Sequence, residues 1–247
     1  MIAADAIPGE IFDVLKTSSK VAVLTGAGIS TESGVPTFRG AQTGLWAKYD
    51  PLQLATPEAF RNDPELVWDW YTWRRALISN LLPNPGHHAL VEMESFFSGF
   101  TLITQNVDGM HQLAGSRQVI ELHGNIFRTK CSRDGRLISG IPDASESPPR
   151  CPECGSYLRP DVVWFGEGLP ARVLENALQA TNSCDLFLSI GTSTLVEPSA
   201  SLPFIALDTG ARVIEINPQT TPFSRSASYS IRGKAGDVLP KLTTQLV

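Results

Sequence analysis

The sequence predicts an α/β protein with a Rossmann-like parallel sheet and a smaller inserted domain, made of a helical module and a cysteine-containing ribbon. Short apolar runs separated by helix-length segments predict the sheet, because buried parallel strands joined by crossover helices produce this alternation. Two stretches that break the alternation predict the insertion.

Four apolar runs are the expected strands, and each of them ends in small or polar residues. The runs are residues 21–24, 101–104, 185–190 and 212–216. Continuous apolar runs of this length are typical of strands that are buried on both faces. A helix over residues 8–18 is expected before the first strand, because its apolar residues have helical spacing.

The inserted segments differ from the sheet in periodicity and composition. Apolar residues recur at helical spacing over residues 64–82, whereas residues 130–159 are rich in Cys, Pro, Ser and Gly. We assign 1–38, 83–128 and 160–247 to the Rossmann-like domain, 39–82 to the helical module and 129–159 to the ribbon module.

Charge and composition exclude several classes of protein. The net charge of −5 argues against nucleic acid as a partner. No apolar run reaches the roughly 18 residues of a membrane span, and the first residues lack the basic patch of a signal peptide. Three of the four cysteines fall within residues 131–154, which favours a metal site in a reducing compartment over a disulfide scaffold. We expect a cytoplasmic monomer that binds neither membrane nor nucleic acid.

The first expected strand runs into the glycine-rich turn TGAGIS, residues 25–30. Glycines let a backbone approach a pyrophosphate closely, and the amides of the turn are donors for it. Thr31 stands where a third glycine would complete the dinucleotide fingerprint, and Asp50, the acidic residue at the expected distance, follows no strand. Taken alone, the motif leaves a dinucleotide site and a plain tight turn equally open.

Four further motifs follow in a fixed order along the chain. With the extended turn at residues 26–40, they are TQNVDGMH at 104–111, ELHGN at 121–125, GTS at 191–193 and NP at 217–218. In these five motifs the sequence resembles the sirtuins, the Sir2-type deacylases. The resemblance spans residues 21 to about 237 and implies an NAD-dependent enzyme that removes acyl groups from protein lysines, releasing nicotinamide and O-acyl-ADP-ribose.

The resemblance also implies the roles of individual residues. His123 stands at the family's general base, and a neutral imidazole with a pKa near 6.5 suits that role. Asn106 and Asp108 complete the catalytic set. The implied NAD contacts are Gly26, Ala27, Gly28, Ser30, Phe38, Arg39, Gln105, Asn106, Asp108, Gly191, Thr192, Ser193, Asn217 and Ala235.

Acyl-lysine proteins are the implied substrates. The segment at residues 159–167 resembles the family's substrate-binding strand, to which an extended peptide adds by main-chain hydrogen bonds. Its implied substrate contacts are Val163, Trp164, Phe165, Gly166 and Glu167. From composition alone, residues 162–165 would be an ordinary buried strand.

Tyr71 and Arg74 are three residues apart, so on a helix they share a face. A phenol and a guanidinium suit a carboxylate at the end of an acyl chain. The pair, with the small residue Ala55, resembles the bacterial class III sirtuins, which act on succinyl-, malonyl- and glutaryl-lysine. Without the resemblance, a surface arginine beside a packing tyrosine would be the better interpretation.

The cysteines resemble the sirtuin zinc module, which presents two C-x-x-C pairs. Here Cys151 and Cys154 form one pair, whereas Asp134 takes the place of the second cysteine after Cys131. Zinc accepts carboxylate oxygen as well as thiolate, so one structural ion in a Cys₃Asp, zinc-ribbon-like site is the expectation, with loss of the metal as the alternative.

Three other functions fit parts of the sequence. A protein mono-ADP-ribosyltransferase would use the same NAD site with another acceptor. A hydride-transferring dehydrogenase lacks the third glycine and the acidic ribose contact, and a non-catalytic zinc-ribbon protein conflicts with the intact run from Gln105 to His123. Of the other histidines, His87 and His88 are expected at the surface or in a helix cap, and His111 in a structural role.

Overall fold

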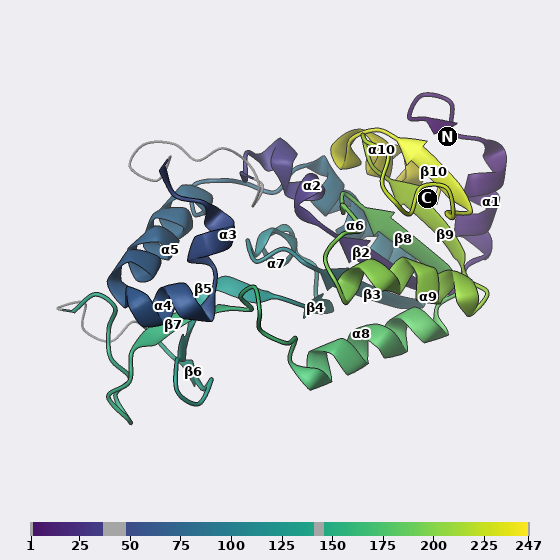
Figure 1. Cartoon of the computed structure of the whole chain (residues 1–247). Helices are drawn as coiled ribbons and strands as arrows, with labels where there is room; N and C mark the ends of the chain where they lie inside the picture. The colour runs from purple at the N-terminus through teal and green to yellow at the C-terminus, as the bar shows by residue number, and fades with distance from the viewer. Residues whose placement is uncertain (1, 37–47, 141–145, 247) are drawn as a thin grey trace.

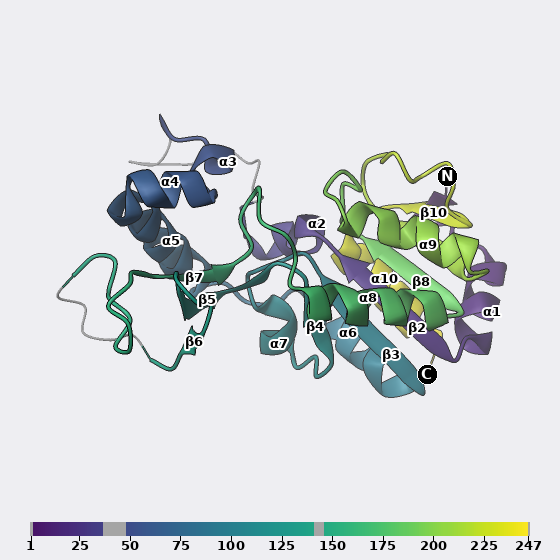
Figure 2. The same cartoon turned by 60° about the horizontal axis from the view of Figure 1, so that its bottom comes forward.

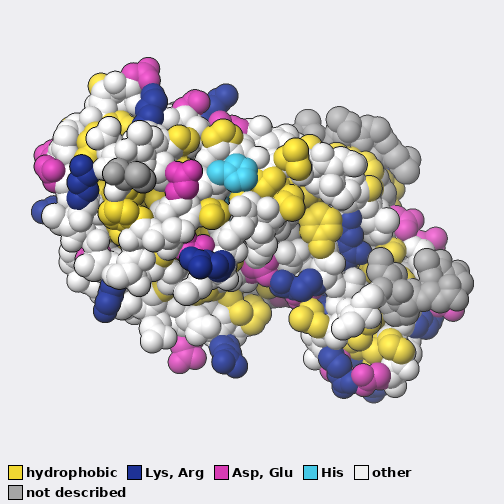
Figure 3. Space-filling view, turned by 180° about the vertical axis from the view of Figure 1, so that it is seen from behind, with side chains coloured by type: hydrophobic (Ala, Val, Ile, Leu, Met, Phe, Trp, Pro, Cys, Tyr) yellow, Lys and Arg dark blue, Asp and Glu magenta, His cyan; other side chains and the backbone are white. Residues whose placement is uncertain are grey.

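The chain folds into two lobes of unequal size, seen side by side in two views of the computed structural model (Figures 1 and 2). The structure describes residues 2–36, 48–140 and 146–246. On the reverse side, hydrophobic side chains gather where the lobes meet (Figure 3). Among the described residues, no helix has the length and apolar character needed to cross a bilayer.

The larger lobe is built on a seven-stranded sheet in which every neighbouring pair is parallel. Its order is β1-β10-β9-β8-β2-β3-β4. The strands are β1 (Ile2–Ala3), β2 (Lys20–Thr25), β3 (Gly99–Thr104), β4 (Val119–Glu121), β8 (Leu186–Ile190), β9 (Arg212–Ile216) and β10 (Tyr229–Arg232). The four predicted runs are β2, β3, β8 and β9, and the doubly wound α/β prediction is confirmed.

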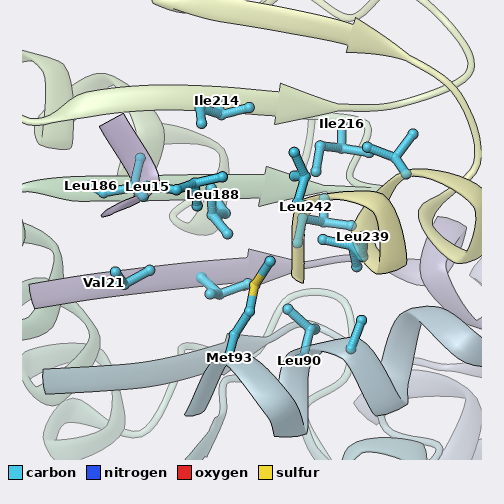
Figure 4. Packing of buried hydrophobic residues seen from close by; sticks show 14 of the residues in the cluster. Leu15, Val21, Leu90, Met93, Leu186, Leu188, Ile214, Ile216, Leu239 and Leu242 are labelled. Carbon is cyan, nitrogen blue, oxygen red and sulfur yellow. The ribbon is translucent and has the colours of Figure 1, made fainter. Parts of the chain in front are cut away.

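Helices cover both faces of this sheet. α1 (Gly9–Thr17), α6 (Pro85–Phe96) and α10 (Ala235–Thr243) pack on one face (Figure 4), and α8 (Ala171–Ser183) and α9 (Leu202–Asp208) on the other. The residues of β2 between Lys20 and Thr25 are all apolar because both faces of the strand are buried. Val23 packs with α1, α6 and α10 on one face, and the adjacent Leu24 packs with α8 and α9 on the other.

Within the described residues, the smaller lobe combines three helices with a three-stranded antiparallel sheet of order β6-β5-β7. Its elements are α3 (Pro51–Leu54), α4 (Pro57–Asn62), α5 (Pro64–Ile78), β5 (Gly124–Cys131), β6 (Leu137–Ile138) and β7 (Leu158–Val162). Each helix begins with proline after a capping side chain, Asp50, Thr56 or Asp63. The predicted module limit at 128/129 falls inside β5, and the three-module division stays a prediction.

Candidate active site

Two glycine-containing turns meet where the order of the parallel strands reverses, between β2 and β8. The first turn is residues 26–28, after β2, and the second is residues 191–193, after β8. The Gly28 N–H donates to the Gly191 carbonyl (2.8 Å). A Cβ on Gly28 would lie 2.7 Å from the Gly191 Cα, and Gly191 itself has φ +59°. Only glycine allows this approach of two backbones. Ligands of doubly wound sheets bind at this reversal, outside the carboxyl ends of the strands.

Side chains from neighbouring strand ends hold the second turn in place. Gln105, after β3, donates from Nε2 to the Thr192 hydroxyl (2.8 Å), and Asn217, after β9, donates from Nδ2 to the Thr192 carbonyl (2.8 Å). Thr192 is buried and Ser193 beside it is exposed. Four strand ends therefore form one hydrogen-bonded edge that includes the predicted phosphate and adenosine contacts.

A buried polar group lies beneath the first turn. Asn106 donates from Nδ2 to the Gly26 carbonyl (3.1 Å) and to the Ser30 hydroxyl (3.2 Å). Asp108 accepts from the Met110 N–H (3.0 Å), and its burial raises the pKa of the carboxyl. Ala27, in the short helix α2 (Ala27–Ser30), is exposed at the same edge. These predicted cofactor contacts come together in the fold.

His123 stands at the junction of the lobes, directly before β5. Its Nδ1 lies 2.8 Å from the Gln105 carbonyl oxygen, which can only accept, so Nδ1 carries a proton. In the neutral ring Nε2 then has a free lone pair. Burial lowers the pKa of His123 below its ordinary value, which keeps the ring neutral at pH 7. His123 is therefore a half-buried, neutral imidazole with an unprotonated Nε2.

His87 and His111 lie beneath this edge, and of the two places expected for His87, the surface or a helix cap, the structure shows the cap. His87 is 0% exposed: its Nδ1 accepts from the Asn84 N–H (3.2 Å) in a helix-capping box, and its Nε2 lies 3.3 Å from the Ser30 hydroxyl. His111 Nε2 pairs with the Thr25 hydroxyl (2.9 Å). Burial lowers their pKa values to about 4 and about 3. The Asn-Pro-x-His run was the sequence signal for the cap.

Ala235 is buried at the start of α10, and the next residue ties this helix to the first turn. The Gly236 N–H donates to Glu32 Oε1 (2.9 Å), in the 3₁₀ helix η1 (Thr31–Ser33). Phe38 and Arg39, also predicted to contact the cofactor, lie outside the described residues.

The predicted acyl pocket lies in the smaller lobe. Tyr71 is 1% exposed and Arg74 is 6% exposed, both on α5, and the Arg74 guanidinium lies 5.2 Å from the centre of the Trp70 ring. Burial raises the pKa of Tyr71 and lowers that of Arg74, and in Arg74 the Asp108 carboxylate opposes this lowering. Tyr71 is therefore a neutral phenol at pH 7, buried on the same helix as the Arg74 guanidinium.

The predicted substrate segment follows β7 and runs between the lobes. The Val163 N–H donates to the His123 carbonyl (2.9 Å), and the Phe165 N–H donates to the carbonyl of the buried Ala55 (2.9 Å). Phe165 and Gly166 are exposed. Glu167 has a different environment: Arg159 binds both of its carboxylate oxygens (2.6 and 2.8 Å) and lowers its pKa, although burial opposes this.

The cysteine cluster forms at the far end of the smaller lobe. The sulfurs of Cys131, Cys151 and Cys154 all lie within 4.8 Å of one another, which is a spacing that one tetrahedral metal ion can bridge. The Asp134 carboxylate instead accepts from the Arg136 backbone N–H (3.0 Å) and guanidinium (3.3 Å). The fold therefore brings three of the four predicted ligands together.

Comparisons with known proteins agree on one family. The Sir2 family model matches residues 26–198. The chain is 55% identical over 214 residues to NAD-dependent protein deacylase 1 of Caldanaerobacter subterraneus subsp. tengcongensis, covering 86% of this chain and 88% of the relative. It is 50% identical over 236 residues to NAD-dependent protein deacylase 2 of Pyrobaculum aerophilum, covering 96% and 94%.

Solved structures agree with these relatives. A Sir2 homolog–NAD complex superposes with a TM-score of 0.91 at 45% identity, covering 97% of this chain and 94% of the other. A mutant Sir2 homologue in complex with 2′-O-acetyl ADP ribose has a TM-score of 0.89 at 45% identity, with coverage of 97% and 96%. A Sir2 protein bound to an acetylated peptide has a TM-score of 0.86 at 31% identity, with coverage of 96% and 97%.

Proposed function

This chain belongs to the Sir2 family, and we propose that it is an NAD-dependent protein-lysine deacylase that transfers the acyl group to ADP-ribose. Bound NAD⁺ is a substrate and supplies an electrophilic ribose carbon, C1′, once its nicotinamide leaves. The acyl-lysine carbonyl oxygen attacks that carbon. A ribose hydroxyl then attacks the acyl carbon, the lysine amine leaves, and one water molecule is consumed, so the products are free nicotinamide, the deacylated lysine and O-acyl-ADP-ribose.

The state of His123 is the observation that carries this proposal. Its Nδ1 is bound to the Gln105 carbonyl, and burial keeps the ring neutral, so Nε2 can take a proton from a ribose hydroxyl. Asn106 and Asp108 orient the nicotinamide ribose from the buried group beneath the first turn. Thr192, Ser193 and Asn217 face the phosphates and the adenosine, as do the Gly26–Gly28 turn and Ala235.

The substrate is an acylated lysine on an extended peptide, which adds to the segment at residues 163–167. Its exposed members, Phe165 and Gly166, are available to a peptide strand. The acyl chain points toward Tyr71 and Arg74, and we propose succinyl- and malonyl-lysine as the preferred substrates, with acetyl-lysine turned over less well. A buried guanidinium beside a neutral phenol recognises a carboxylate that an acetyl group lacks.

One structural zinc ion is proposed for the smaller lobe. Cys131, Cys151 and Cys154 would provide three thiolates, and Asp134 would take the fourth position by exchanging its Arg136 guanidinium contact for the metal. Four protein ligands close the coordination shell, so the ion stabilises the module and takes no part in the reaction.

The location and partners follow from the same chemistry. We propose a reducing compartment, the cytoplasm, because none of the four cysteines is in a disulfide and three of them gather at the proposed metal site. Acylated proteins are the partners, and the enzyme acts as a monomer.

Mass spectrometry of a succinyl-lysine peptide incubated with NAD⁺ tests the proposal. Unmodified peptide, free nicotinamide and O-succinyl-ADP-ribose are the expected products, and an acetyl-lysine peptide gives the same products more slowly. A mono-ADP-ribosyltransferase would instead add the mass of ADP-ribose to the acceptor, and that product without deacylation would contradict the proposal.

A further inference from the structure

The Tyr71 hydroxyl is hydrogen-bonded to the indole of Trp164, which lies in the segment after β7 and in the same buried cluster. Trp164 Nε1 donates to the Tyr71 oxygen over 3.0 Å, and both side chains are almost fully buried. An indole N–H can only donate. The Tyr71 oxygen therefore accepts in this bond, and the phenol proton is directed elsewhere.

Trp164 is itself fixed from two directions. The Arg159 guanidinium carbon lies 3.3 Å from the centre of the Trp164 ring, and the Trp164 backbone N–H donates to Glu167 Oε2 (2.8 Å). Arg159 binds both oxygens of Glu167 and also donates to the Val162 carbonyl (2.9 Å). The Arg159–Glu167 ion pair thus holds both the ring and the backbone of Trp164. The indole N–H therefore has little freedom to turn away from Tyr71.

We propose that Trp164 is a positioning residue for acyl selectivity, which orients Tyr71 as a hydrogen-bond donor toward the carboxylate of the acyl group. This inference rests on the acyl preference proposed above. The pairing leaves Tyr71 as a donor beside the guanidinium of Arg74, and two donors match an ionised carboxylate. A rotated Tyr71 would present its oxygen lone pairs, which repel a carboxylate.

The Arg159–Glu167 pair has an indirect role in this positioning. Glu167 lies in the segment expected to contact substrate, but its carboxylate oxygens are occupied by Arg159 and by the Trp164 N–H. Its contribution to recognition is therefore indirect and runs through the position of Trp164.

The test is a double-mutant cycle read as the ratio of kcat/KM on succinyl-lysine to kcat/KM on acetyl-lysine peptides. Trp164→Phe keeps an aromatic ring and removes the N–H, so the ratio is expected to fall roughly three- to tenfold, the range of one hydrogen bond. Tyr71→Phe is expected to lower the ratio at least as much. In the Tyr71→Phe background, Trp164→Phe should lower it no further, because the hydroxyl that Trp164 orients is gone.

A general loss of structure in Trp164→Phe would not produce this pattern. It would lower turnover of both peptides, and its effect would add to the effect of Tyr71→Phe in the double variant. Replacement of Trp164 by 3-benzothienylalanine, in which sulfur takes the place of the N–H, keeps the shape of the ring and should reproduce the fall in ratio if Trp164→Phe does not fold. An unchanged ratio in a folded Trp164 variant, while Tyr71→Phe lowers it, overturns the positioning role and leaves the acyl preference intact. A wild-type enzyme with no preference for succinyl-lysine overturns the acyl preference and the inference with it.

Discussion

Short motifs predict both the carboxyl edge of the parallel sheet and the cysteine module. In the structure, the predicted residues contact one another at the sheet edge, but only three of the four do so in the cysteine module. At the sheet edge, Gln105, Asn106 and Asn217 all bond to other motif residues or to their backbones. In the cysteine module, three sulfurs meet, but the fourth predicted ligand, Asp134, bonds to Arg136.

The difference lies in what positions the residues. Parallel strands of one sheet end at a common edge, so motifs that follow different strands must meet whatever their side chains do. After β5 ends at Cys131, the described part of the cysteine module is mostly turns, with β6 only two residues long, and a metal ion would supply much of its order. Sheet topology alone thus determines the first site, whereas the second depends on a choice among nearby polar partners.

The largest effect is expected at the sheet edge, from His123→Ala. Deacylation should fall ~10²–10⁴-fold, the typical contribution of a general base, with NAD⁺ affinity little changed because the glycine turns do not depend on this side chain. Steady-state kinetics and NAD⁺ binding by calorimetry measure the two quantities. The matched control is His88→Ala, an exposed histidine on α6, which should behave as wild type. Activity of His123→Ala within about threefold of wild type would remove His123 from the mechanism.

The proposed acyl pocket on α5, in the same lobe as the cysteine module, gives the next largest effect. Arg74→Met should lower kcat/KM on succinyl-lysine by roughly 30-fold or more, because a desolvated arginine–carboxylate contact is worth roughly 2–5 kcal/mol when truncated. Turnover of acetyl-lysine should change far less. Arg61→Met, which removes an exposed arginine from α4, controls for the loss of charge. Equal losses on both substrates would mean that Arg74 supports the pocket and does not recognise the acyl carboxylate.

Substitutions at Asp134 test the cysteine module directly. Purified protein should carry close to one zinc. If Asp134 leaves Arg136 for the metal, Asp134→Cys should tighten zinc binding and Asp134→Ala should weaken it, each by about tenfold. Competition with a chromophoric chelator measures both. Glu146→Ala removes an exposed carboxylate that pairs with Arg150 in the same module, and is the control. Identical zinc affinity in all variants would mean that Asp134 binds only Arg136 and is not a zinc ligand. Folded, active protein without zinc would exclude the metal site.

The smallest effect concerns pH. Burial lowers the pKa of His123, so its neutral, base-competent form persists to more acidic pH than in a free histidine. As pH falls, kcat/KM should therefore be lost with a midpoint below 6.5, the ordinary value for histidine. A pH profile of kcat/KM between pH 5 and 9 measures it. A midpoint above 6.5 would indicate that a nearby negative charge outweighs burial at this ring.

The sequence by itself determined the sheet and the identity of its edge. Apolar runs such as β2 are recognisable because both faces of a central parallel strand are buried, and the motifs after β2, β3, β8 and β9 then had to share one edge. The shortest strands of this sheet, β1 and β4, contain two and three residues, too few to show a periodicity.

Only the tertiary structure decided which polar side chains pair with each other. His87 is buried against Ser30, and Glu167 is bound by Arg159. Periodicity reports the face of an element on which a residue lies, but a hydrogen bond between distant segments depends on how the loops pack. The hydroxyl of Tyr71 is the clearest example of such a long-range pairing. It accepts from Nε1 of Trp164, which is 93 residues away along the chain and 3.0 Å from the Tyr71 oxygen in space.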